Sequence, residues 1–138
     1  MGAGRKPLPP AHQFGRLRAV LPGFHGRITP VGIVCWGLLS PLPLSRDYNV
    51  RLEYQRMKLP RAFVETPTLR HPTRGDPPHI YGPDEPCLFY TKEREWEPHR
   101  WIATTIVPWL LEWLAYYESW CATGIWQGEG VHPAKREV

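Results

Sequence analysis

The residue best suited to chemistry in this sequence is Cys87. It lies in a proline-rich stretch, between Pro86 and Leu88, and it follows the acidic pair Asp84 and Glu85. A cysteine in a loop is more often exposed and reactive than one inside an apolar strand or helix. The neighbouring carboxylates would raise the pKa of its thiol, which suits a carrier that passes on an acyl group better than a protease nucleophile.

His79, eight positions before Cys87, is the second candidate. Two interpretations of it stay open: a hydrogen-bonded turn former, and the partner of Cys87 in a catalytic dyad, for which no local protease signature is present. The other cysteines, Cys35 and Cys121, sit in apolar stretches and are expected to fill the core. No metal or cofactor is expected, because the sequence has no C-x-x-C or H-x-x-x-H pair and no glycine-rich phosphate loop.

The composition places these residues in one domain. A length of 138 residues is close to that of a typical single domain, expected here over residues 14–130, between a flexible arm at 1–13 and a polar tail at 131–138. No apolar run reaches the roughly 18 residues that span a bilayer, and the N-terminus lacks the apolar region of a signal peptide. Three cysteines do not make a disulfide scaffold, so a cytoplasmic location is expected.

The net charge of +4 conceals two halves of opposite sign. Residues 1–74 hold twelve Lys and Arg against three acidic residues, a net +9, whereas residues 75–138 hold five against ten, a net −5. A basic half could attract nucleic acid, so a basic nucleic-acid-binding module stays an alternative. The bases do not form a run, which favours a solvated sheet face and makes nucleic acid the weaker hypothesis. The residues that such a module would use are Arg51, Arg56, Lys58 and Arg61.

The first half of the chain predicts a short helix followed by strands. Apolar residues from Phe14 to Leu21 have helical spacing, and Pro22 ends the helix. Residues 48–54 alternate strictly between apolar and polar, which is the pattern of a half-buried strand. Together with single strands predicted at 28–39 and 61–64, they indicate an antiparallel meander.

The second half predicts a long flap and then a helix. Residues 66–98 hold nine prolines and glycines and have little periodicity, and long loops in a compact domain are usually functional. Aromatic and aliphatic residues recur every three or four positions over 101–120, which predicts an amphipathic helix that Pro108 kinks or divides and Gly124 ends. The order of sheet, flap and helix predicts an α+β domain.

These elements and motifs, in this order, resemble the ubiquitin-conjugating enzymes. In that family an antiparallel β-meander leads to a His-Pro-Asn flap, a Cys-Leu active-site pair and a Trp-x-Pro ahead of the next helix. The resemblance covers about residues 24–123. The stretches that carry it are Leu38-Leu39-Ser40-Pro41, Tyr48 to Tyr54, Pro60 to Pro67, His79-Ile80-Tyr81, Cys87-Leu88 and Trp96-Glu97-Pro98.

The C-terminal third is similar to the stand-alone conjugating proteins of bacterial type II CBASS antiphage operons. This similarity implies a UBC-like fold and a transferase that attaches the C-terminus of a cyclic-oligonucleotide synthase (CD-NTase), or of a ubiquitin-like protein, to lysines of target proteins. Since the sequence holds no nucleotide-binding motif, the adenylation that normally precedes this transfer would come from a separate activating enzyme or be bypassed. The matching stretches are Ile106 to Trp109, Glu112 to Leu114, Tyr117 to Trp120 and Thr123 to Gly128.

The resemblance also implies roles for single residues. Cys87 would carry the thioester, and His79 would shape the flap more than move protons. The Tyr81 hydroxyl and loop amides would hold the developing oxyanion, since Tyr81 stands where the eukaryotic enzymes have Asn. Asp84 or Glu85 would orient or deprotonate the incoming amine if either lies within hydrogen-bond reach.

Two further expectations follow from the same comparison of motifs. Trp96 is expected to support the loop after Cys87 and not to touch the substrate. A non-catalytic UBC-like module, which binds a ubiquitin-like tail without transferring it, stays an alternative because Ile80 and Tyr81 replace the Pro and Asn of the flap.

Overall fold

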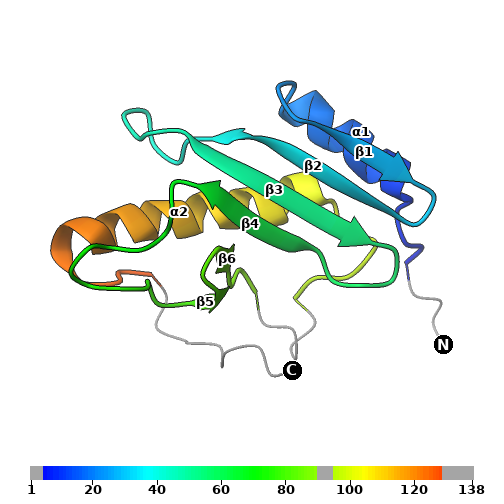
Figure 1. Ribbon diagram of the computed structural model, residues 1–138. Helices are drawn as coiled ribbons and strands as arrows, with labels where there is room; N and C mark the ends of the chain where they lie inside the picture. Colours follow the sequence, from blue (N-terminus) through cyan, green and yellow to red (C-terminus); the bar gives the residue numbers. More distant parts are fainter. Residues whose placement is uncertain (1–4, 90–94, 129–138) are drawn as a thin grey trace.

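The computed structural model describes residues 5–89 and 95–128. A four-stranded antiparallel sheet in the order β1-β2-β3-β4 lies across the long C-terminal helix α2, and the N-terminal helix α1 packs beside the β1 edge (Figure 1). The predicted α+β class is confirmed, and the arrangement is the one that the resemblance to ubiquitin-conjugating enzymes implies. The strands are β1 (His25–Thr29), β2 (Gly32–Leu39), β3 (Tyr48–Gln55) and β4 (Arg61–Thr66).

Strand β3 is the centre of the sheet and follows its sequence pattern. Tyr48, Val50, Leu52 and Tyr54 are buried, while the residues between them are half-buried on the outer face. The strand pairs with β2 on one side and with β4 on the other. The strict alternation of apolar and polar residues therefore determines which face meets the helix.

The single strand predicted for residues 28–39 is wrong, because the chain reverses near its start, between Thr29 and Gly32. The Thr29 side-chain oxygen accepts hydrogen bonds from the backbone N–H groups of Val31 and Gly32, at 3.3 and 3.1 Å. A Cβ at Gly32 would lie 2.6 Å from the backbone oxygen of Tyr54, so the close approach of β3 requires glycine there. The meander accordingly has four strands where the sequence predicted three.

Helix α2 (Ile106–Thr123) follows a short 3₁₀ turn, η1 (Ile102–Thr104). Pro108 is its third residue and lies in the first turn, where a missing N–H costs no helical bond, so the proline neither kinks the helix nor occupies its first position. The helix ends as predicted at Gly124, which has φ 82° and donates its N–H to the Trp120 carbonyl at 2.7 Å. No helix in the described part of the chain is long and apolar enough to cross a membrane.

Helix α1 (Pro10–Val20) begins four residues before Phe14 and so takes in part of the segment that the composition favours as an arm. Its fully buried Gln13 ties it to η1: the side-chain amide donates to the Arg100 carbonyl at 2.8 Å and accepts from the Ile102 N–H at 2.9 Å. The helix ends just before Pro22, as expected. The predicted polar tail, residues 131–138, lies outside the described residues.

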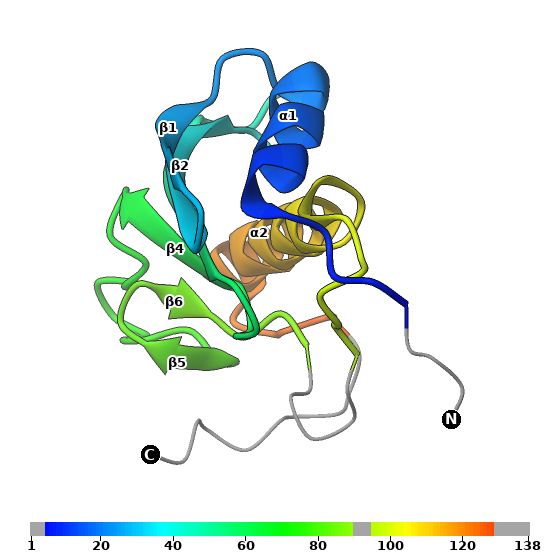
Figure 2. The same cartoon turned by 90° about the vertical axis from the view of Figure 1, so that its right-hand side faces the viewer.

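The predicted flap contains a small second sheet. Strands β5 (Ile80–Gly82) and β6 (Glu85–Pro86) form a hairpin that lies at the β4 edge of the main sheet, across from α2 (Figure 2). The Val64 N–H of β4 donates to the Asp84 carbonyl at the hairpin turn, at 2.8 Å. This hairpin carries the candidate residues of the flap.

Candidate functional site

Cys87 and His79 face each other at the open end of the β5–β6 hairpin. Each lies one residue outside its strand, and the Cys87 N–H donates to the His79 carbonyl at 2.9 Å. The eight-residue separation seen in the sequence is therefore the length of one hairpin. The backbone of His79 directly sets the position of Cys87.

His79 has an unusual backbone conformation, with φ 60°. Few residues other than glycine adopt this left-handed region, so the surroundings must hold it there. Its carbonyl accepts a second hydrogen bond, from Nε1 of Trp113 in α2, at 3.1 Å. Its ring lies against Trp126, with the ring centroids 5.2 Å apart.

Tyr81 and Cys87 share one acceptor. The Tyr81 hydroxyl donates to the Phe89 carbonyl at 3.4 Å, and the Cys87 thiol donates to the same oxygen at 3.9 Å. Both side chains therefore point toward the same carbonyl oxygen. Cys87 itself is 9% exposed.

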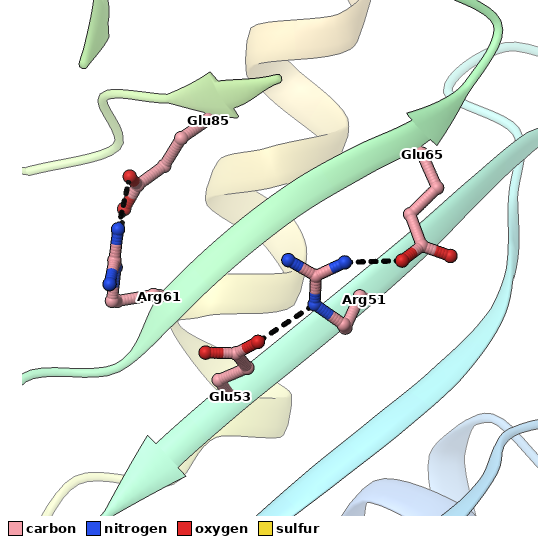
Figure 3. Close-up of polar contacts among 5 residues, drawn as sticks. All are labelled: Arg51, Glu53, Arg61, Glu65 and Glu85. Atoms are coloured by element: carbon pink, nitrogen blue, oxygen red, sulfur yellow. Dashed lines mark hydrogen bonds and ion pairs between the residues drawn. The ribbon is translucent and has the colours of Figure 1, made fainter. Parts of the chain in front are cut away.

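The two acidic candidates lie at the other end of the hairpin. Asp84 is exposed in the turn between the strands, whereas Glu85 is buried and forms a bidentate ion pair with Arg61 of β4, at 2.7 and 2.9 Å (Figure 3). The hydrogen bond to Glu85 and the attraction of its charge raise the pKa of Arg61. The Glu85 carboxylate is thus paired with Arg61, while Asp84 lies in the hairpin turn.

A pocket of about 390 Å³ opens on the side of the hairpin where Tyr81 lies. Pro86 and Leu88, the two neighbours of Cys87, both line it. Its wall is mainly apolar, with one basic residue and one ion pair at the rim, so it suits the apolar part of a peptide segment. The remaining lining residues are Lys58, Leu59, Pro60, Arg61, Ala62, Glu85, Phe89 and Ile106.

The other two cysteines occupy different environments. Cys35 is fully buried in β2, and burial raises the pKa of its thiol to about 12 in spite of a backbone hydrogen bond at Leu52. Its thiol therefore stays protonated at neutral pH, as expected of a core residue. Cys121 is half-buried in α2 and packs against the edge of the core.

Trp96, expected to support the loop after Cys87, is part of the core. The indole is buried, donates from Nε1 to the Thr105 hydroxyl at 2.9 Å, and packs edge-on against Tyr54 with centroids 5.5 Å apart. It therefore connects the residues that follow the flap to the start of α2 and to the central strand.

Three contributors escaped the sequence analysis. Trp113 entered only as part of a helical pattern, Trp126 only within the Thr123–Gly128 stretch, and Arg61 only as part of a strand, of the Pro60–Pro67 stretch and of a candidate nucleic-acid surface. Their partners His79 and Glu85 lie more than twenty positions away, so spacing alone does not reveal them. The recurrence of tryptophan in the segment that follows the flap motif is the one sequence signal for Trp113 and Trp126.

Two of the four basic residues named as candidate nucleic-acid contacts form ion pairs. Arg51 pairs with Glu53 at 2.8 Å and with Glu65 on the outer face of the sheet, and it lies over the Phe63 ring (Figure 3). Arg61 pairs with Glu85, so two of these four bases are in ion pairs within the described part of the chain, which weakens a nucleic-acid footprint. Within residues 5–89 and 95–128, no three His, Cys, Asp or Glu side chains are grouped to hold a metal ion.

Comparison with known proteins agrees with this geometry. A family model described as the type II CBASS E2 protein matches residues 13–133, which is most of the chain and includes the hairpin, α2 and the segment that follows α2. No curated protein matches the sequence.

Proposed function

The chain belongs to the type II CBASS E2 family, and on this basis we propose that it is a ubiquitin-conjugating-like transferase with Cys87 as its nucleophile. The observation that carries the proposal is the set of hydrogen bonds around Cys87 and its acceptor, the Phe89 carbonyl. The His79 carbonyl holds its backbone, while the Tyr81 hydroxyl and the Cys87 thiol meet at the Phe89 carbonyl. This arrangement suits acyl transfer through a thioester.

The proposed reaction has two steps. In the first, the Cys87 thiol loses its proton to solvent, and its sulfur attacks the C-terminal carbonyl of a partner protein that has been activated as an acyl adenylate. The C–S bond forms and AMP leaves. In the second, a lysine amine attacks the thioester, the C–S bond breaks, the amine releases a proton and an amide remains. The Tyr81 hydroxyl and loop amides would stabilise the oxyanion in both steps.

The proposed partners follow from the family. The donor would be the C-terminus of a cyclic-oligonucleotide synthase, or of a ubiquitin-like protein, activated by a separate enzyme. The apolar pocket beside Cys87 supports this proposal, because it could accept the residues that precede the reacting carbonyl. A role for Asp84 or Glu85 in orienting the amine stays a prediction, and the ion pair of Glu85 with Arg61 counts against it for that residue.

The experiment uses the chain with a candidate donor, a cyclic-oligonucleotide synthase, and with an activating enzyme and ATP. Cys87→Ala should abolish the adduct that reducing agents cleave, and Cys87→Ser should replace it by a stable ester, because an oxygen ester resists thiols. Non-reducing gels and intact mass report both species. Cys35→Ala and Cys121→Ala are matched controls that should keep the adduct, and an adduct that persists in Cys87→Ala would refute the assignment.

A second candidate function has one observation in its favour. Cys87 is only 9% exposed, which suits a UBC-like module that binds a partner's tail without reacting with it. In that case the unmodified chain would bind the synthase but form no adduct with ATP and an activating enzyme, and Cys87→Ala would bind with the same affinity. Isothermal titration beside the gel assay separates the two functions.

A further inference from the structure

The segment after α2 turns back toward the flap. Gly124, in the left-handed conformation, reverses the chain, and the Thr123 hydroxyl accepts the Ile125 N–H at 3.1 Å. A Cβ at Gly124 would lie 3.0 Å from the Arg74 guanidinium, so this position has little room for a side chain. The orange-red end of the described chain runs back beneath α2 toward β5 (Figures 1 and 2).

This segment brings Trp126 onto the flap. Its ring lies among those of His79, Trp113 and Tyr116, at centroid distances of 5.2, 5.3 and 5.9 Å. Gly128 closes the arrangement, because a Cβ there would approach Nε1 of Trp126 to 2.7 Å and the Tyr116 ring to 2.8 Å. The indole is thus enclosed by aromatic rings of α2 on one side and by His79 on the other.

His79 is therefore held from two directions. Trp113 donates to its carbonyl, and Trp126 packs against its ring. These contacts oppose relaxation of a backbone conformation that a histidine seldom adopts without support. The same carbonyl receives the Cys87 N–H, so any movement of His79 shifts the nucleophile.

We propose that Trp126 is a positioning residue for Cys87: through His79 it holds the open end of the hairpin in the geometry that the sulfur needs for acyl transfer. The proposal rests on the proposed function for the reaction itself. The positioning can be measured without any partner, because the reactivity of Cys87 toward a small alkylating agent depends on the same geometry.

The test compares Trp126→Ala and Trp126→Phe with the unmodified chain. In Trp126→Ala the loosened hairpin should expose Cys87, so that iodoacetamide alkylates it several-fold faster, measured by peptide mass spectrometry over a range of pH. Cys121 in the same molecule is the internal reference and should keep its rate. In Trp126→Ala the rate of adduct formation should fall on the order of tenfold. Trp126→Phe retains an aromatic ring, so its alkylation rate and its rate of adduct formation should both be close to those of the unmodified chain.

The matched control is Trp36→Ala. It also removes a tryptophan that stacks on a histidine, His25 at 6.0 Å, but on the outer face of the sheet, and it should change neither rate. Equal acceleration at Cys87 and Cys121 in Trp126→Ala would indicate general loosening and overturn the proposal, as would unchanged rates. If the unmodified chain forms no adduct, the proposed function fails, while the alkylation rates still decide the role of Trp126.

Discussion

At the scale of single residues, the same side chain has different chemistry according to its neighbours. Cys35 and Cys87 are both buried cysteines, yet Cys35 lies within the sheet core, where burial raises the pKa of its thiol to about 12. Cys87 lies at the open end of a hairpin beside a tyrosine hydroxyl that shares its acceptor. Position in the fold, more than residue type, separates a core residue from a candidate nucleophile.

The raised pKa of Cys35 predicts a loss of stability in alkali. Below pH 9 the Cys35 thiol is protonated in both the folded and the unfolded chain, so its ionisation does not change the free energy of unfolding there. As the pH rises from 9 toward 12, the unfolded thiol ionises while the folded one stays protonated, so the free energy of unfolding falls by up to about 1.4 kcal/mol per pH unit. Urea titrations between pH 8 and pH 11 measure this slope.

The variant Cys35→Ala provides the comparison. It removes the titrating group, so its free energy of unfolding should decline less steeply above pH 9 than that of the unmodified chain. Parallel pH profiles for the unmodified chain and Cys35→Ala would contradict the prediction.

At the scale of elements, the β5–β6 hairpin depends on contacts with β4. A two-residue strand cannot stabilise a hairpin alone. The Arg61–Glu85 ion pair and the hydrogen bond from Val64 to the Asp84 carbonyl attach its turn to the main sheet. The hairpin can then hold Cys87 opposite His79, because its other end is fixed.

The Arg61–Glu85 ion pair predicts that substitutions of the neighbouring acids Glu85 and Asp84 change the free energy of unfolding by different amounts. Glu85→Gln should lower the free energy of unfolding by about 1 kcal/mol, because a buried charge-assisted pair is weakened while the guanidinium is partly screened by solvent. The Glu85 side chain is 7% exposed and that of Arg61 44%. Asp84→Asn, in the exposed turn, should change stability by less than about 0.5 kcal/mol. Urea denaturation measures both, and equal losses would contradict an anchoring role for Glu85.

At the scale of the whole molecule, the core joins the sheet to both helices and to the segment between α1 and β1. Phe24, between α1 and β1, packs directly over Gly37 of β2. A side chain at Gly37 would place its Cβ 2.1 Å from the ring of Phe24. The link after α1 can therefore lie close to the sheet only because β2 has a glycine at this point.

This close contact predicts opposite effects of two alanine substitutions. Gly37→Ala should lower the free energy of unfolding by about 1–3 kcal/mol, because Phe24 must move out of a packed core. Gly15→Ala is the control: it lies inside α1 with no atom within 4 Å of the added Cβ, and it should raise stability by about 0.5–1 kcal/mol. Thermal or urea unfolding checks both. A neutral Gly37→Ala would contradict the packing.

The sequence by itself determined the local elements and the nucleophile candidate. Alternation over residues 48–54, helical spacing before Gly124 and the proline-rich surroundings of Cys87 are patterns that neighbouring residues encode. The break at Thr29–Gly32 was missed, because an apolar run interrupted by one proline still resembles a strand. That turn depends on a side-chain hydrogen bond and on the approach of β3.

Only the tertiary structure decided how the candidate residues are grouped. It placed Glu85 on Arg61, moved Asp84 to the far end of the hairpin, and brought Trp113 and Trp126 onto His79. Each of these contacts joins residues more than twenty positions apart or on opposite ends of one hairpin. Such contacts are set by how the sheet, the hairpin and α2 pack together, and this packing is not visible in local spacing.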